Sequence, residues 1–227
     1  MHQKKSKKLF IYIFLFLIVG TLNNRSLNDA YFVKVDKITV SGLDKKNNFE
    51  LSNNLNFLKI SNLFFLDQHK IEEIINANNL VEKYSVFKRY PSTLNIKVNK
   101  TIFLAQIKKE NNHFFLGSNG RFINTKNTKN TKNNIPYIFG EFKVNNFFEL
   151  KKAIDDTNFN YNDIKNFFFF QSGRWDIETN NGILVKLPKK KIKESLQIFI
   201  DIISKDNQRL INNVDLRQKN QIIINGH

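Results

Sequence analysis

The side chains best suited to acid–base chemistry or metal binding are few and scattered in this sequence. Asp155 and Asp156 are adjacent at a predicted helix end, and Asp215 lies far along the chain. Adjacent helical residues point to different faces, so capping or solvation explains the aspartate pair better than catalysis does. His69 and His113 stand in separate segments with no ligand spacing around them, whereas a metal site needs three or four convergent ligands. We therefore expect no metal site.

The residues of other catalytic chemistries are also missing. The chain has no cysteine, which excludes disulfides, thiolate catalysis and cysteine-based zinc sites. Its eight glycines form neither a phosphate-binding loop nor a nucleophile elbow. We interpret Trp175, the single tryptophan, as a core residue rather than a binding hot spot. The sequence therefore predicts a protein that is not an enzyme and holds no cofactor.

The overall charge is strongly positive, at +16, with 36 basic against 20 acidic residues. Such a charge invites a nucleic-acid or anionic-membrane hypothesis. The lysines, however, are spread over most of the chain, and no basic stripe is interleaved with an RNA-binding motif. Abundant Asn, Lys, Ile and Phe indicate a compositional bias instead. We expect no nucleic-acid partner.

The amino terminus carries a basic cluster followed by an apolar run. Lysines at positions 4, 5, 7 and 8 precede the run at 9–22, which as a helix would span about 21 Å of a hydrocarbon core of about 30 Å. This short length suits a cleaved signal peptide, but no A-x-A-like cleavage site follows near Ala30. Flanking lysines can also snorkel to the interface. We expect an uncleaved transmembrane helix at 9–22, with a cytoplasmic tail at 1–8 and the remainder exported.

The next segment predicts a small α+β module over 33–102, after a linker at 23–32. A strand ending at Ser41–Gly42 precedes two helices, for which Asn47 and Asp67 are the expected N-caps. Two strands follow, and the second alternates apolar and polar residues after the dipeptide Tyr90–Pro91. We expect both helices on one face of a three-stranded sheet. The first strand is marked by Val33, Val35, Ile38 and Val40. The apolar faces of the two helices are Leu51, Leu55 and Leu58, and Ile71, Ile74 and Ile75, and the buried face of the last strand is Leu94, Ile96 and Val98.

The remainder, 103–227, predicts a mainly antiparallel β domain with packed helices. A hairpin turns at 118–120, two strands join at 180–182, and one or two strands end the chain. Low complexity at 124–134 predicts a mobile loop without function. Helices are expected around 145–154 and 191–205. The predicted inward residues are Phe147, Leu150, Ile154, Trp175, Ile177, Ile183, Val185, Leu187, Ile192, Leu196, Phe199 and Ile203.

The order of these features resembles the FtsQ/DivIB family of bacterial cell-division proteins. The resemblance rests on the lysine-rich tail, one apolar segment, "VEKYSVFKRYPSTLNIKV", "FLGSNGRFI", "PYIFGE", "RWDIETNNGILVKL" and "VDLR". The chain departs from the family pattern at 99–103, where an acidic residue and a proline are usual, and at Gly117 and Pro188. The resemblance implies a POTRA domain (β-α-α-β-β) at 33–102 and a β domain at 103–227. It further implies a single-pass inner-membrane scaffold of the division septum, with a cytoplasmic N-terminus and a periplasmic bulk.

The resemblance also implies partners and a site. The expected partners are FtsL- and FtsB-type division proteins, with FtsK among the other divisome components. Binding would occur by strand addition at a terminal edge strand, with Arg174 meeting an acidic residue of the partner. The alternative is that the three isoleucines in this segment are simply core. The candidate site residues are Arg174, Arg217, Gln218, Lys219, Asn220, Gln221, Ile222, Ile223 and Ile224.

Three other functions remain open from the sequence. A POTRA-containing export or outer-membrane assembly component would need a long run of barrel strands after residue 102, and the remaining chain is short for that. An anchored periplasmic enzyme lacks a catalytic constellation. A basic surface-binding protein would show a steep salt dependence.

Overall fold

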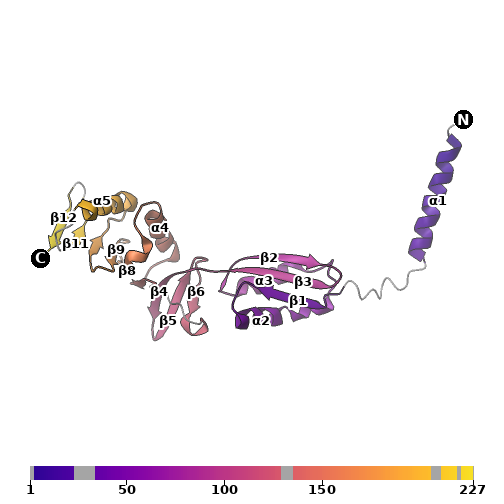
Figure 1. The fold of residues 1–227 in the computed structure, drawn as a ribbon, viewed down its shortest axis with the longest axis horizontal. Helices are drawn as coiled ribbons and strands as arrows, with labels where there is room; N and C mark the ends of the chain where they lie inside the picture. The colour runs from indigo at the N-terminus through magenta and orange to yellow at the C-terminus, as the bar shows by residue number, and fades with distance from the viewer. Residues whose placement is uncertain (1–2, 23–33, 129–134, 206–210, 219–220, 227) are drawn as a thin grey trace. The chain divides into compact units, whose positions relative to one another are not determined.

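The computed structural model describes residues 3–22, 34–128, 135–205, 211–218 and 221–226. The chain divides into two compact units, residues 1–78 with 84–98, and residues 79–83 with 99–227 (Figure 1). Helix α1 (Gln3–Leu22) contains the predicted apolar run, and its side chains from Leu9 to Leu17 are exposed. Within the described ranges, no helix combines the length and the apolar character needed to cross a membrane.

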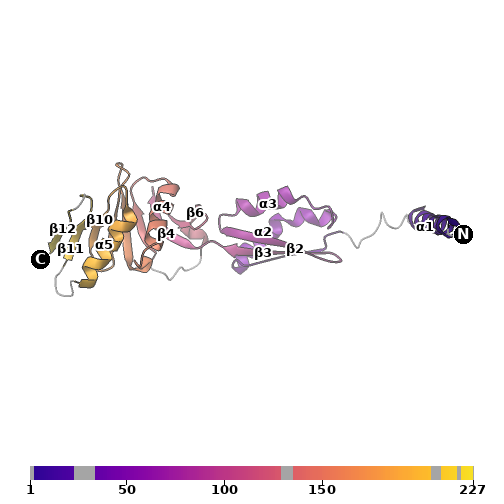
Figure 2. The same ribbon diagram turned by 90° about the horizontal axis from the view of Figure 1, so that it is seen from above.

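After α1, the first unit has the predicted order of strand, two helices and two strands. Its sheet has the strand order β1–β3–β2, and β1 runs parallel to β3. Figure 2 shows α2 and α3 on one side of these strands. This arrangement confirms the α+β prediction for the segment. The elements are β1 (Lys37–Ser41), α2 (Lys45–Asn54), a 3₁₀ turn (Asn56–Ile60), α3 (Gln68–Ala77), β2 (Val81–Arg89) and β3 (Thr93–Lys100).

Local chemistry explains the ends of both helices. The Asp67 carboxylate accepts the Lys70 N–H and caps α3, as predicted. The prediction that Asn47 caps α2 is wrong, because the cap is Asp44, which accepts the Asn47 N–H at 3.0 Å. An aspartate three residues earlier satisfies the same orphan donors and starts the helix sooner.

The core of the first unit follows the predicted apolar spacing. The inward residues of β3 are at most 4% exposed, and the same holds for those of α2 and α3 apart from Ile74, which is only half-buried. Ile38 and Val40 of β1 are also half-buried rather than buried. Val35 is buried but precedes β1, which begins at Lys37, and Val33 lies outside the described residues. The buried set is Val35, Leu51, Leu55, Leu58, Leu63, Leu66, Ile71, Ile75, Leu94, Ile96 and Val98.

The second unit is a mixed sheet with two helices. Its strand order is β12–β11–β10–β9–β8–β7–β4–β5–β6. The β4–β7, β7–β8 and β10–β11 pairs are parallel and the other neighbours antiparallel. The elements are β4 (Phe103–Lys109), β5 (Asn112–Gly117), β6 (Phe122–Asn124), β7 (Tyr137–Phe139), α4 (Val144–Asp155), β8 (Ile164–Phe169), β9 (Trp175–Thr179), β10 (Leu184–Lys186), α5 (Ile192–Lys205), β11 (Ile211–Asp215) and β12 (Ile223–Gly226).

The predicted bounds of two segments in this unit need correction. The segment 167–187, predicted as two strands joined at 180–182, contributes to three strands, because the chain also reverses at 170–174 between β8 and β9. The predicted loop at 124–134 begins inside regular structure, since Asn124 ends β6 and Thr125–Asn127 form a 3₁₀ turn. Residues 129–134 of that loop lie outside the described part of the chain.

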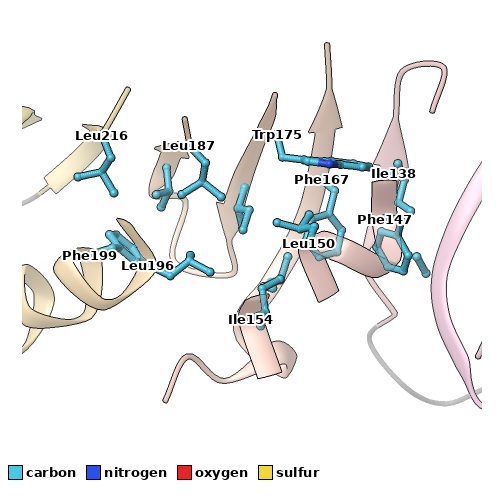
Figure 3. Close-up of a cluster of buried hydrophobic side chains, with 14 of the residues drawn as sticks. Ile138, Phe147, Leu150, Ile154, Phe167, Trp175, Leu187, Leu196, Phe199 and Leu216 are labelled. Atoms are coloured by element: carbon cyan, nitrogen blue, oxygen red, sulfur yellow. The ribbon is translucent and has the colours of Figure 1, made fainter. Parts of the chain in front are cut away.

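Aromatic packing forms the core between the sheet and its helices. Figure 3 shows Phe147 and Leu150 of α4 and Phe199 of α5 under the strands. Trp175 is 2% exposed and meets Phe147 and Phe167 edge-on, which confirms its prediction as a core residue. The inward prediction for Ile203 is wrong, because this side chain near the end of α5 is 37% exposed.

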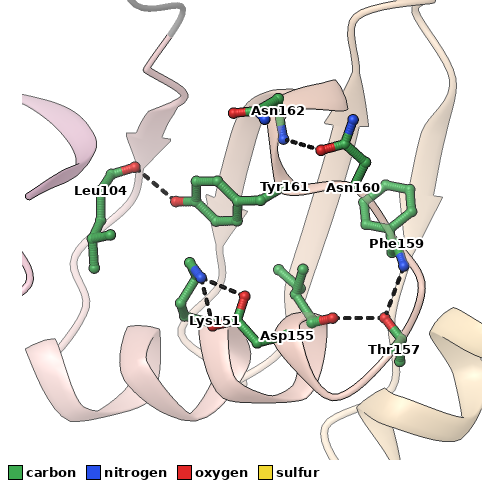
Figure 4. A network of polar contacts seen from close by, with 9 residues as sticks. Leu104, Lys151, Asp155, Thr157, Phe159, Asn160, Tyr161 and Asn162 are labelled. Atoms are coloured by element: carbon green, nitrogen blue, oxygen red, sulfur yellow. Dashed lines mark hydrogen bonds and ion pairs between the residues drawn. The ribbon is translucent and has the colours of Figure 1, made fainter.

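Polar contacts fix the connection between α4 and β8 (Figure 4). The Tyr161 hydroxyl donates to the Leu104 carbonyl at 2.7 Å, and burial raises the pKa of this phenol well above its usual value. Lys151 pairs with Asp155 and lies over the Tyr161 ring. The Asp155 carboxylate is thus held in an ion pair, and Asp156 is the C-cap of α4, where its backbone N–H donates to the carbonyls of Lys152 and Ile154. The Asp156 carboxylate lies 4.0 Å from the Lys193 Nζ.

Candidate partner-binding edge

Strand β12 forms one end of the sheet in the second unit. It pairs antiparallel with β11, in a register that places Ile224 opposite Val214 and Ile223 opposite Asp215. On its other side no further strand lies among the residues that the structure describes. A strand in this position presents a row of backbone N–H and C=O groups to solvent or to an added strand. β12 is therefore a template for an extended partner segment.

Apolar side chains are exposed along this edge. Ile222, Ile223 and Ile224 are 45%, 40% and 41% exposed. Ile224 continues a cross-strand row whose inner members, such as Val185 and Val214, are at most 1% exposed. Isoleucines that served only the core would be covered like their neighbours in that row. This edge thus offers apolar surface that the described chain leaves uncovered.

A cluster of charges lies beside the same edge, on the sheet face opposite the helices. In the strand register, Asp176 of β9 lies opposite Lys186 of β10, and Lys186 lies opposite Asp215 of β11. Asp215 in turn lies opposite Ile223 of β12. Side chains alternate across a strand, so this row faces away from the core row of Ile177, Val185 and Val214. Arg174 and Arg217 complete the group, which we call the charged face. Three cations against two carboxylates leave it net positive.

The two carboxylates of the charged face are in different electrostatic states. Asp215 accepts hydrogen bonds from the Arg217 backbone N–H at 3.0 Å and from its guanidinium, which lower the pKa of the carboxyl. The same contact raises the pKa of Arg217. At Asp176, burial raises the pKa, and the charges of Arg174, Arg217 and Lys186 act against that rise. The pKa of Asp215 is therefore lowered and that of Asp176 is raised.

Arg174 is oriented by an aromatic ring rather than by a hydrogen bond to a carboxylate. Its guanidinium lies 4.2 Å from the centre of the Phe170 ring. The Arg174 Nε and the Asp176 Oδ1 are 3.6 Å apart, which is an ion-pair distance but too long for a hydrogen bond. Neither of these two buried atoms has a hydrogen-bond partner among the described residues. Arg174 therefore keeps hydrogen-bonding capacity that is not used within the described chain.

The structure brings together two parts of the predicted site. Arg174 and Arg217, far apart in sequence, both interact with Asp176 on the charged face. Gln218 and Gln221 are exposed and lie outside the strands, and Lys219 and Asn220 lie outside the described residues. Sequence reasoning missed Asp176, Lys186 and Phe170. Alternation alone could have placed Asp176 and Lys186 on the outer face, but their pairing depends on a cross-strand register that a single sequence does not reveal.

Candidate metal ligands are not gathered in the described part of the chain. Among the described residues there is no group of three or more His, Asp or Glu side chains placed to hold a metal ion. One open hollow on the second unit's surface has a volume of about 610 Å³ between the ends of β4 and β7, and is lined by residues such as Lys109, Phe122 and Phe139.

Two family models match consecutive segments of the chain. Residues 33–100 match the POTRA domain of FtsQ type, and residues 105–217 match the C-terminal region of cell division protein FtsQ/DivIB. The segments meet with only 101–104 between them. The second includes the charged face and ends just before β12.

Individual relatives agree with these matches. Cell division protein FtsQ from Rickettsia bellii is 26% identical over 196 residues, covering 84% of this chain and 72% of that protein. The FtsQ of Rickettsia felis is 26% identical over 198 residues with the same coverage. A solved structure of the major extracytoplasmic domain of DivIB from Geobacillus stearothermophilus aligns with 49% of this chain and 99% of its own, at 15% identity and a TM-score of 0.35. With both of its modules matched in order, the chain belongs to the FtsQ/DivIB family of bacterial cell-division proteins.

Proposed function

We propose that this chain is a non-enzymatic scaffold of the divisome, linking early and late division proteins at the septum. In this proposal α1 anchors it in the inner membrane, with the N-terminus cytoplasmic and the bulk of the chain, after α1, periplasmic. The second unit binds the periplasmic segments of FtsL- and FtsB-type partners by strand addition at β12. FtsK-type components are the expected earlier partners.

The exposed edge of β12 is the observation that supports this proposal best. A partner strand would hydrogen-bond to the open side of β12 and place its own apolar side chains beside Ile223 and Ile224. It would extend the buried cross-strand row of Val185 and Val214 by one strand. Ile224 would then gain the cover that its neighbours in this row already have, which favours binding through the loss of exposed apolar area.

The net positive charge of the charged face favours a partner that carries acidic residues. Arg174, Lys186 and Arg217 outnumber the two aspartates, and the Arg174 side chain is still 29% exposed. A partner with acidic residues next to its added strand would pair with these cations, speeding encounter and fixing the register. Arg174 suits this role because its guanidinium is already held on the Phe170 ring.

The membrane part of the proposal rests on α1. Its side chains from Leu9 to Leu17 are exposed around the helix, so no polar side faces water. Lys4, Lys5, Lys7 and Lys8 precede this run, as expected for a cytoplasmic flank. These lysines can extend along the lipid tails toward the headgroups, which lets a short apolar run serve as an anchor.

A binding experiment with the full chain tests the partner site. The detergent-solubilised chain is titrated with the periplasmic segments of the FtsL and FtsB proteins of the same organism. We expect micromolar or tighter binding, weakened about 30-fold by Ile224→Asp, because a charge buried against a partner strand costs about 2 kcal/mol. Phe49→Asp is the control, since Phe49 on α2 is 66% exposed and far from β12 in sequence. Equal binding by wild type and Ile224→Asp would contradict strand addition at this edge.

A pair of proline variants tests whether the backbone of β12 is used. Successive N–H groups of a strand point to opposite sides, so Ile223→Pro and Ile224→Pro remove donors from opposite edges of β12. We expect one variant to lose stability and the other to lose partner binding while remaining folded. Absence of binding by the wild-type chain would reject the scaffold proposal itself and favour an export role for the POTRA domain.

A further inference from the structure

A second exposed apolar surface lies in the first unit, far in sequence from β12. It consists of Ile60, Phe64, Phe65 and Tyr90, which we call the aromatic tip. Ile60 and Phe65 are each 85% exposed, Phe64 is 54% exposed and Tyr90 is 59% exposed. Single exposed apolar residues are common on protein surfaces, but a local group of large ones marks an interaction site.

The core of the unit does not need these side chains. In the run 63–66, Leu63 and Leu66 are 0% and 8% exposed and hold the segment to the core. Phe64 and Phe65, between them, face solvent. The two leucines thus pack the segment into the core, and the two exposed phenylalanines are available to contact a partner.

Contacts within the unit hold the tip in place. The Phe64 and Tyr90 rings stack with their centres 5.0 Å apart. The Asn62 Oδ1 accepts the Phe64 N–H at 2.9 Å, and the Lys88 Nζ donates to the Phe64 carbonyl at 3.0 Å. The Phe65 N–H donates to the Asn62 carbonyl at 3.1 Å. Because these backbone groups are already bonded, the tip offers apolar side chains rather than a strand edge.

The charges next to the tip are mostly positive. The segments 56–67 and 87–92 that form it contain Lys59, Lys88 and Arg89 but only one acidic residue, Asp67. The Asp67 carboxylate caps α3 and pairs with Lys70 at 3.6 Å, so much of its charge is compensated locally. Aromatic side chains flanked by cations are the composition of surfaces that bind an anionic bilayer at the headgroup level.

The chain arrives from α1 at this tip. Lys34 forms an isolated antiparallel β-bridge with Asn62, and the Val35 N–H donates to the Ser61 carbonyl at 3.2 Å. Both Ser61 and Asn62 come just before Phe64 in the chain. Only residues 23–33 connect Leu22, the end of α1, to Lys34. A segment of that length spans at most about 40 Å. The tip therefore cannot lie farther than this from the end of α1.

We propose that the aromatic tip docks on the periplasmic surface of the anionic membrane in which α1 is anchored. This inference rests on the anchoring part of the proposed function. Phe64, Phe65 and Ile60 enter the boundary between headgroups and acyl chains, and Tyr90 keeps its hydroxyl at the polar level. Lys59 and Arg89 meet the lipid phosphates. The first unit is thereby held against the membrane while β12, in the second unit, binds its partner.

Fluorescence quenching by brominated lipids tests this docking with the full chain. The chain is reconstituted in vesicles of phosphatidylglycerol and brominated phosphatidylcholine, and flotation shows whether α1 is anchored. Phe65→Trp places a reporter on the tip, and Phe49→Trp places one at a similarly solvent-facing position of α2. Trp175 is buried, so the parent chain gives the baseline. We expect the added fluorescence of Trp at 65 to fall at least about twofold, as for a residue a few ångströms inside the interface, with little change at 49.

Each outcome separates the docking from the anchor. If the chain floats but the two reporters are quenched equally or not at all, the tip does not dock, whereas the anchor stands. If the chain does not float, the anchor fails and the docking with it. Quenching at 65 that disappears when both Phe64→Ser and Lys59→Gln are added would support the proposed contact. Shielding of the reporter by added FtsL and FtsB segments instead of by lipid would assign the tip to a protein partner and overturn the proposal.

Discussion

The aromatic tip and the β12 edge both expose large apolar side chains, but their backbones differ. At the tip, the N–H groups of Phe64 and Phe65 and the carbonyl of Phe64 already have partners. At β12, one side of the strand is bonded to β11 and the other has no neighbouring strand in the described ranges. The first surface can offer only apolar contact and charge. The second can also offer a ladder of directional hydrogen bonds.

This difference bears on what each surface can recognise. Lipid headgroups and acyl chains have no extended backbone, so a surface with a bonded backbone loses nothing by meeting them. An extended peptide brings its own unpaired N–H and C=O groups, which need an open strand edge. Exposed apolar area alone does not separate these cases. The hydrogen-bonding state of the backbone beneath it does.

The largest effect on stability is expected in the segment that carries the aromatic tip, where Leu63 is buried and Phe65 is exposed. Leu63→Ala should lower the free energy of unfolding by about 3 kcal/mol, because it opens a cavity at a fully buried position. Phe65→Ala, two residues along, should change it by less than about 0.5 kcal/mol, because the ring is 85% exposed. Urea unfolding of both full-length variants measures the contrast. A comparable loss from Phe65→Ala would mean that the ring stabilises the fold, which would remove the reason to assign it to a partner.

A smaller effect should separate the two aspartates of the charged face. The pKa of Asp215 is lowered in the folded state, so its contribution to stability is present above its unfolded pKa and is lost as the pH falls through the folded pKa. Asp215→Asn should therefore destabilise the chain by about 1–2 kcal/mol at pH 7. That loss should shrink below a pH of about 4.

Asp176 should behave in the opposite way. Burial raises its folded-state pKa, so the ionised carboxylate costs stability above that pKa, and the cost disappears below the unfolded pKa. Asp176→Asn should leave stability unchanged or raise it by up to about 1 kcal/mol at pH 7. Unfolding curves of the wild type and both variants at pH 7 and pH 3.5 test the pair. Equal destabilisation by the two substitutions at neutral pH would show that Arg174, Arg217 and Lys186 compensate Asp176 more strongly than its burial penalises it.

The sequence predicts most of the fold because local rules determine it. The alternation of Leu94, Ile96 and Val98 and the helical spacing of Phe147, Leu150 and Ile154 give the correct buried faces. The local rules fail where two residues near each other could both be the N-cap of a helix. At the start of α2 the N-cap is Asp44 and not Asn47. They also fail near the end of α5, where Ile202 packs against the core and Ile203 is exposed.

The candidate sites are only partly visible in the sequence, for a physical reason. The β-branched run in "IIIN" is typical of a strand, but its place at one end of the sheet follows from the strand order, and the charged face exists only through the register of β9, β10 and β11. The aromatic tip is hidden in a different way. In "NLFFLD" all four apolar residues look alike, and only the packed structure shows that the leucines turn inward and the phenylalanines outward.

The smallest expected effect tests whether charge contributes to the tip but not to the edge. Arg89 is exposed beside Tyr90, and one cation near an anionic membrane surface contributes about 1 kcal/mol. Arg89→Gln should therefore reduce the ratio of docked to undocked tip about fivefold, read from the quenching of Trp at position 65. Binding of FtsL and FtsB segments should not change. Lys45→Gln on α2 removes the same charge from another exposed position and should alter neither readout. If both substitutions weaken docking equally, the membrane responds to the overall positive charge of the chain, and the tip contributes only its apolar side chains.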